Sequence, residues 1–219
     1  MKIKSVKILG DNFSTLAANK LYEFNVSFRE DRLSTKVFAG LNGSGKSNFL
    51  ELFSEIFYYL ELYHLDTVSE EEKSSKSFGF EIEYFLPMVK PGKNLLDFDN
   101  SVDFDMHVKI IKPLGLKPEF LYVPLGKKEF IRLDECTQTL LPSRVIAYTS
   151  GQNELLSNPY YKLKYHYFKT FEDTKKLEEG EQISENHRLF FIDYNANYSI
   201  FVANMLLGES KKTTILKRT

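Results

Sequence analysis

The sequence predicts an α/β fold in which short strands lead into one long helix, with an antiparallel β meander attached. Polar and apolar residues alternate over Lys2–Leu9 and Leu21–Phe28, as in strands with one buried face. From Ser47 to Tyr63 the apolar residues recur every three or four positions, which is the spacing of one helix face. Between Phe78 and Leu133, strand-like segments are separated by Pro, Gly or Asn turns.

The composition is that of a globular protein. Of 219 residues, 42% are hydrophobic and 15% are aromatic, which is too many for a disordered chain. Lys and Arg total 29 against 30 Asp and Glu, so only a local patch can attract nucleic acid. No apolar run approaches the roughly 20 residues that span a bilayer, and the single Cys136 fits a reducing compartment. We therefore expect a cytoplasmic protein without a membrane partner.

The other elements follow in chain order. The short apolar run Lys36–Ala39 is expected to be a central strand, and residues 68–77, with three Glu and four Ser, a solvated connector. The meander strands are expected at Phe78–Leu86, Val102–Ile111, Phe120–Val123 and Phe130–Leu133. Two later strands, Ser143–Tyr148 and Arg188–Asp193, are expected to rejoin the central sheet.

The segment between the short strand and the long helix has a motif that binds phosphate. Gly40-Leu41-Asn42-Gly43-Ser44-Gly45-Lys46-Ser47 matches the P-loop pattern G-x-x-x-x-G-K-[ST], for which a chance match in such a chain is on the order of one in a hundred. Its glycines let successive backbone N–H groups point at phosphate oxygens. The following helix adds the positive end of its dipole. We expect ATP with Mg²⁺ as ligand, with Lys46 on the β and γ phosphates and Ser47 on the metal.

The loop extended by Asn48 resembles that of ABC-type ATPases of the chromosome-maintenance and recombination-repair kind. Those ATPase heads also open with a strand, an Asn-Phe turn and a second strand, as Ile3–Phe13 and Leu21–Phe28 do here. More narrowly, the chain resembles the N-terminal part of restriction-system-associated AAA-family ATPases of bacterial antiviral defence. The resemblance covers about the first 65 residues. It implies an ABC-type head lobe around the P-loop NTPase core.

The order of the expected elements gives the domain organisation, and the resemblance implies the partners. Residues 1–219 form a P-loop ATPase domain, with a nucleotide-binding core at 1–67, an antiparallel β section at 78–133 and a return to the core at 143–219. The C-terminal residues do not resemble a finished domain end, so we expect the N-terminal part of a longer protein. The family implies a second ATPase head, as in a homodimer, or a defence protein as partner, with DNA as a further candidate.

Two later motifs have competing interpretations. Ser150-Gly151-Gln152 resembles a shortened ABC signature, Ser-Gly-Gly-Gln, but an ordinary Ser-Gly turn explains it as well. If a helix opens at Leu155, Pro159 is expected to limit its length. Asp193 ends an apolar strand, as a Walker B aspartate does, but Tyr194 follows where the family has a catalytic Glu. The alternative is a turn at the end of the strand.

The remaining candidate groups point away from metal or thiol chemistry. The four histidines are scattered without metal-ligand spacing, and Cys136 follows two acidic residues and is interpreted as structural. The segment Tyr160–Lys169 interleaves lysines with aromatic residues, which suits either a nucleic-acid surface or an ordinary strand or amphipathic helix.

Two functions remain open at this point. The first is a nucleotide-driven ATPase that serves DNA processing or phage defence. The second is a nucleotide-sensing module that binds ATP for assembly without turnover. Catalytic residues are not identified, and ATP hydrolysis by this chain alone is expected to be weak or absent, because no Asp-Glu pair closes a strand after the loop.

Overall fold

The computed structural model describes residues 1–26, 35–66, 68–74, 78–88, 104–124, 127–149, 154–175 and 188–193, together with 195–196, 198–199, 201–203 and 205–206. The chain divides into two compact units, Met1–Ser143 and Arg144–Thr219.

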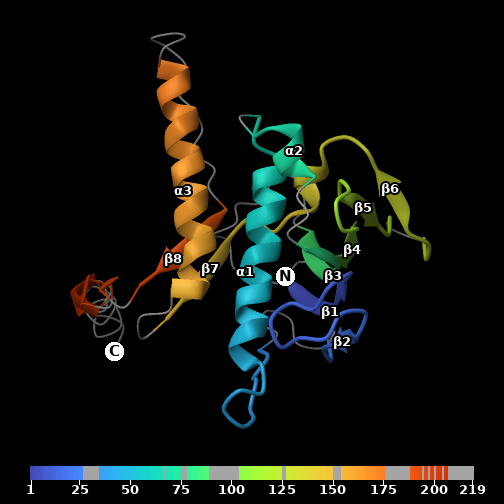
Figure 1. Cartoon of the computed structure of the whole chain (residues 1–219), viewed down its shortest axis with the longest axis horizontal. Helices are drawn as coiled ribbons and strands as arrows, with labels where there is room; N and C mark the ends of the chain where they lie inside the picture. Colours follow the sequence, from blue (N-terminus) through green and yellow to red (C-terminus); the bar gives the residue numbers. More distant parts are fainter. Residues whose placement is uncertain are drawn as a thin grey trace, which may run out of the picture. The chain divides into compact units, whose positions relative to one another are not determined.

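The first unit contains a six-stranded antiparallel sheet (Figure 1). Its strands are β1 (Lys2–Leu9), β2 (Leu21–Glu23), β3 (Gly79–Met88), β4 (Phe104–Lys112), β5 (Glu119–Tyr122) and β6 (Ile131–Leu133). They lie in the order β2-β1-β3-β4-β5-β6, and every neighbouring pair is antiparallel. The mixed α/β class and the antiparallel meander predicted from the sequence are therefore confirmed.

Alternation along the strands gives this sheet two different faces. In β3 the side chains of Phe80, Ile82 and Tyr84 are fully buried, whereas Glu81 and Glu83 point to the opposite, partly exposed face. In the register of β3 with β4, Tyr84 lies opposite Val108 and Glu83 opposite Lys109, so apolar and charged residues are paired across the strands.

The helix α1 (Lys46–Tyr63) packs on the apolar face of the sheet. Three of its aromatic rings contact strand residues: Phe57 lies 6.3 Å from Tyr84, Tyr59 6.0 Å from Phe80, and Tyr63 5.9 Å from Phe120. The hydroxyl of Tyr84 donates a 2.7 Å hydrogen bond to the carbonyl of Leu140, which ends the 3₁₀ turn Thr137–Leu140. This interface is the core of the first unit.

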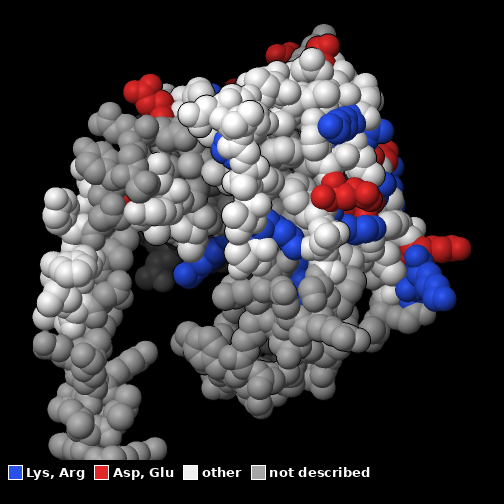
Figure 2. All heavy atoms as spheres, turned by 90° about the horizontal axis from the view of Figure 1, so that it is seen from below, with Lys and Arg blue, Asp and Glu red and all other residues white. Residues whose placement is uncertain are grey.

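The other face of the sheet holds a network of charged side chains centred on Glu83. Its carboxylate accepts hydrogen bonds from Lys4 at 2.7 Å and from His107 at 3.1 Å, and Lys109 lies 3.4 Å away. Lys109 also pairs with Glu81 at 2.6 Å. The hydrogen bond from His107, followed by those from the lysines, lowers the pKa of Glu83 to about 2. In the right-hand part of Figure 2, acidic and basic side chains lie side by side.

Two local predictions within the first unit are wrong. Residues 36–39 form no strand, and Val37 is 83% exposed, because no described strand lies beside this segment to take its hydrogen bonds. Within the expected connector 68–77, a short helix, α2 (Glu70–Lys73), is held by a capping box between Ser69 and Glu72. The second strand is also shorter than expected, ending at Glu23.

The second unit consists of a β-α-β arrangement. β7 (Val145–Tyr148) and β8 (Leu189–Ile192) pair in parallel as a two-stranded sheet within this unit. Between them, α3 (Glu154–Lys175) continues through Pro159, and the prediction that this proline limits the helix is wrong. Burial of Leu156, Tyr160 and Leu163 offsets the one hydrogen bond that the proline cannot donate. No described helix is apolar enough over sufficient length to cross a membrane.

Candidate phosphate-binding site

The predicted phosphate loop forms a tight turn that runs directly into α1. Two of its residues, Gly43 with φ +79° and Gly45 with φ +88°, have left-handed backbone conformations that residues with a Cβ atom adopt only at a cost. Gly45 is also the N-cap of the helix. The backbone conformation therefore favours glycine at these two positions.

The start of α1 retains the properties of an anion site. No side chain caps the helix, and its first turn has no acidic residue. The N–H groups that precede Phe49 at the start of a helix have no intrahelical partner, and they lie at the positive end of the helix dipole. Phe49 is the first residue whose N–H bonds back, to the carbonyl of Gly45 at 3.2 Å. Such a helix start favours a bound phosphate.

Lys46 lies folded over the loop. Its ammonium donates hydrogen bonds to the carbonyls of Gly40 at 2.8 Å and Leu41 at 2.7 Å, and to the Ser44 hydroxyl at 3.4 Å. The adjacent Ser47 is exposed, and its hydroxyl has no hydrogen-bond partner among the described residues. The loop thus brings together one cation, a free hydroxyl and an uncapped helix start, which are the donors that a phosphate chain and its metal need.

A second segment, which the sequence did not indicate, contacts the loop. The side-chain amide of Asn48 donates to the hydroxyls of Ser14 at 3.0 Å and Thr15 at 2.6 Å. These two residues are the tip of a turn in which Phe13 and Leu16 exchange backbone hydrogen bonds of 3.1 and 2.9 Å. No local pattern could reveal this contact, because it joins residues 33 and 34 positions apart.

Gly45 lies close to the same turn. A Cβ atom at Gly45 would approach the Thr15 hydroxyl to 2.9 Å and Leu16 Cδ2 to 3.4 Å. A Cβ atom at Gly43 would meet nothing within 4 Å. The two glycines therefore serve different purposes: Gly43 allows a backbone conformation, and Gly45 also allows a close approach between two segments.

A cluster of aromatic rings holds the segments on both sides of the loop. Phe38, before the loop, stacks on Phe49 of α1 with centroids 5.3 Å apart and an interplanar angle of 15°. Tyr22 of β2 meets Phe49 edge-on at 4.9 Å, and Phe24 lies 6.0 Å from Phe38. Ring packing therefore positions the entry to the loop, where strand pairing was expected to do so.

The two later motifs belong to the second unit or lie outside the described residues. Asp193 follows β8, and its Oδ1 accepts a 3.0 Å hydrogen bond from the backbone N–H of Ala196. This is the turn at a strand end that the sequence left open as the alternative to a Walker B residue. Residues 150–152, the candidate signature, and Tyr194 are outside the described residues.

Other candidate groups have ordinary structural contacts. His64 bonds through its two ring nitrogens to the Leu60 carbonyl at 2.7 Å and the Thr137 hydroxyl at 2.8 Å. Cys136 is an exposed free thiol with φ +53°. Within the described parts of the chain, no group of three or more His, Cys, Asp or Glu side chains is placed to hold a metal ion.

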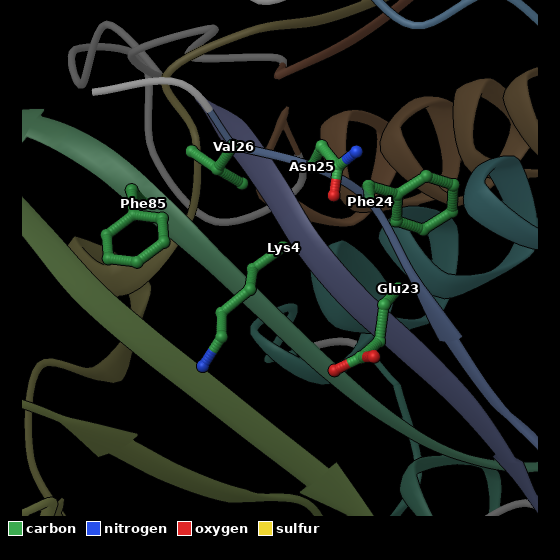
Figure 3. A pocket seen from close by; sticks show the side chains of 6 residues that line it. All are labelled: Lys4, Glu23, Phe24, Asn25, Val26 and Phe85. Atoms are coloured by element: carbon green, nitrogen blue, oxygen red, sulfur yellow. The ribbon is translucent and has the colours of Figure 1, made fainter. Parts of the chain in front are cut away.

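A pocket of about 280 Å³ lies on the first unit and is lined by no residue of the phosphate loop (Figure 3). Its lining residues are Lys4, Glu23, Phe24, Asn25, Val26 and Phe85. Lys4 is already paired with Glu83 at 2.7 Å. Since the pocket contains no residue of the loop and its only cation is engaged, we do not assign it to the phosphate site.

Comparison with known proteins gives no assignment: no family model matches the chain, and neither curated proteins nor solved structures give a match.

Proposed function

We propose that the first unit binds the triphosphate of ATP together with Mg²⁺ through the loop 40–47. One observation carries the proposal. Two left-handed glycines lead the backbone into an uncapped helix start, and the ammonium of Lys46 lies over the same loop. A structural glycine turn would need neither the lysine nor the uncapped helix.

The residues present fit this ligand. On binding, Lys46 exchanges its hydrogen bonds with the loop carbonyls for stronger ones with the β and γ phosphates. Ser47 supplies a hydroxyl to the metal, and the backbone N–H groups of the loop surround the phosphate oxygens. The metal would neutralise phosphate charge. Asn48 holds the adjoining turn through Ser14 and Thr15 and so keeps the helix start in place.

The wider role rests on the resemblance of residues 1–65 to ATPase heads of the chromosome-maintenance and recombination-repair kind, and narrowly to restriction-associated defence ATPases. We propose that the chain is such an ATPase domain in the cytoplasm, working with a second head or a defence protein. The alternative is a sensor that binds ATP for assembly without turnover. The lack of an Asp-Glu pair closing a strand after the loop favours binding over turnover in this chain.

Binding is tested by replacing Lys46 with Ala and titrating the full chain with ATP and Mg²⁺ in a calorimeter. We expect the variant to lose measurable binding, because it lacks the cation that faces the β and γ phosphates. Thermal stability should barely change, since the Lys46 ammonium is exposed. Lys127→Ala, which removes an exposed lysine elsewhere in the same unit, is the control and should bind normally. Wild-type affinity in Lys46→Ala would overturn the site.

Turnover is tested separately by steady-state phosphate release on the same samples. We expect slow or no hydrolysis, because each missing water-positioning or charge-stabilising group is worth on the order of a thousandfold. Rapid turnover that disappears in Lys46→Ala but persists in Asp193→Ala would show that another carboxylate acts in catalysis. It would also exclude the sensor alternative.

A further inference from the structure

Helix α3 in the second unit has two faces of different character. One face is buried against β8: Tyr160 and Tyr161 lie 5.6 and 6.0 Å from the ring of Phe191, and Leu163 is fully buried. Three aromatic side chains are largely exposed: Tyr161 at 52%, which lies at the edge of this interface, and Tyr165 at 68% and Phe168 at 62% beyond it. Exposed rings in this number along one helix are unusual, because aromatic residues are normally buried.

The exposed rings form a row along the helix. Positions 161, 165 and 168 are related by steps of four and three residues, so they share one face. At a rise of 1.5 Å per residue, successive rings are offset by about 6 and 4.5 Å along the axis. Both offsets exceed the roughly 3.4 Å between bases of a stacked strand. The row therefore suits bases that are separated from one another rather than bases within a duplex.

Lysines lie among these rings. Lys162 and Lys164 are exposed, and Lys164 falls on the same face, three residues after Tyr161. From Leu155 to Phe168 the helix has no Asp or Glu, although the whole chain has a net charge of −1. The positive charge is thus local to the aromatic row.

This combination indicates the chemistry of the partner. A surface that docks a protein is depleted in lysine at its centre, whereas here a lysine lies within the row. Surfaces for single-stranded nucleic acid combine cations for the backbone with rings on which unpaired bases stack. Charge complementarity therefore favours a polyanion with planar groups.

We propose that the exposed face of α3 binds single-stranded nucleic acid. Tyr161, Tyr165 and Phe168 stack on bases, and Lys162 and Lys164 contact the phosphates. This surface belongs to the second unit and uses no residue of the phosphate loop, so it does not depend on ATP binding.

The test uses the full chain without nucleotide and a fluorescent oligothymidylate of about 20 nucleotides, which is longer than the site sizes of about 4–16 nucleotides known for such surfaces. Binding is followed by anisotropy at several salt concentrations. The double variant Tyr165→Leu/Phe168→Leu keeps apolar side chains but removes the rings, and we expect binding at least tenfold weaker. The double variant Lys162→Gln/Lys164→Gln should also bind more weakly. The slope of its log binding constant against log salt concentration should be smaller in magnitude by about 1.4, or 0.7 for each lost phosphate contact.

The matched control is Lys127→Gln/Lys128→Gln, which removes the same charge from an exposed site in the first unit and should change nothing. The absence of wild-type binding at low salt, equal binding of a duplex, or unchanged binding in the leucine variant would each overturn the proposal. Far-UV circular dichroism checks the fold, and Phe168→Leu alone replaces the double variant if that one unfolds.

Discussion

The substitutions Gly45→Ala and Gly43→Ala form a matched pair that tests how the phosphate loop is built. Both glycines have φ near +80 to +90°, at +88° and +79° respectively. An alanine in this region costs about 1–2 kcal/mol, of which about 0.4–1 is regained because alanine restricts the unfolded chain. Backbone conformation alone therefore predicts that either substitution lowers the free energy of unfolding by a similar amount, about 0.5–1 kcal/mol.

Contacts make the two positions different. The new methyl at Gly45 would meet the Thr15 hydroxyl at 2.9 Å, whereas at Gly43 nothing lies within 4 Å. That hydroxyl is held by Asn48 at 2.6 Å, so moving it sacrifices a hydrogen bond worth about 0.5–1.5 kcal/mol. We expect Gly45→Ala to destabilise the first unit by about 1–2.5 kcal/mol and Gly43→Ala by about 0.5–1 kcal/mol.

Hydrogen exchange by mass spectrometry suits this comparison, because peptides from α1 and β3 report the unfolding of the first unit alone. The protection of these peptides should fall more in Gly45→Ala than in Gly43→Ala. An equal loss in both variants, or a larger one in Gly43→Ala, would refute the argument that the turn at Thr15 packs against the helix start. Both variants are measured without nucleotide, so the result is independent of ATP binding.

Two further substitutions probe the sheet. The pKa of Glu83 is held at about 2, below its ordinary 4.5, so its ionised form stabilises the fold above about pH 4.5 and this contribution is lost as the pH falls toward 2. Glu83→Gln should therefore lower the free energy of unfolding, measured with urea at pH 7, by about 1–2 kcal/mol after discounting for solvent screening. The difference between the wild type and the variant should shrink as the pH falls toward 2. A difference that does not change with pH would contradict the charged network around Glu83. Tyr84→Phe removes the buried 2.7 Å hydrogen bond to the Leu140 carbonyl and should lower the free energy of unfolding by about 1–3 kcal/mol, whereas an unchanged denaturation midpoint would show that water replaces the hydroxyl.

Periodicity predicted those elements whose burial pattern is regular. The helix expected at Ser47–Tyr63 is α1 at Lys46–Tyr63, and the strand expected at Phe120–Val123 is β5 at Glu119–Tyr122. In α1 the buried residues Leu52, Ile56, Tyr59 and Leu60 lie on one helix face, which imposes the period on the sequence, and in β5 Phe120 is the buried residue. The capping box Ser69–Glu72 was also visible as S-x-x-E, but the polar composition around it concealed the short helix α2.

Elements that depend on a distant partner were not predictable. The run Lys36–Ala39 has the composition of a strand, but a strand exists only where a neighbour takes its hydrogen bonds, and none of the described strands does. Pro159 argued for a short helix, yet burial of one face of α3 outweighs the loss of one hydrogen bond. In both cases tertiary contacts outweigh local preference.

By itself the sequence determined the chemical groups of the candidate site. The glycines, Lys46 and Ser47 form a local motif, and its spacing alone predicts phosphate binding. Only the tertiary structure decided what surrounds them. The contact of Asn48 with Ser14 and Thr15 and the packing of Phe38 on Phe49 join segments far apart along the chain. The physical reason is that local spacing fixes which backbone conformations a segment adopts, whereas long-range contacts depend on how the whole unit buries its apolar surface.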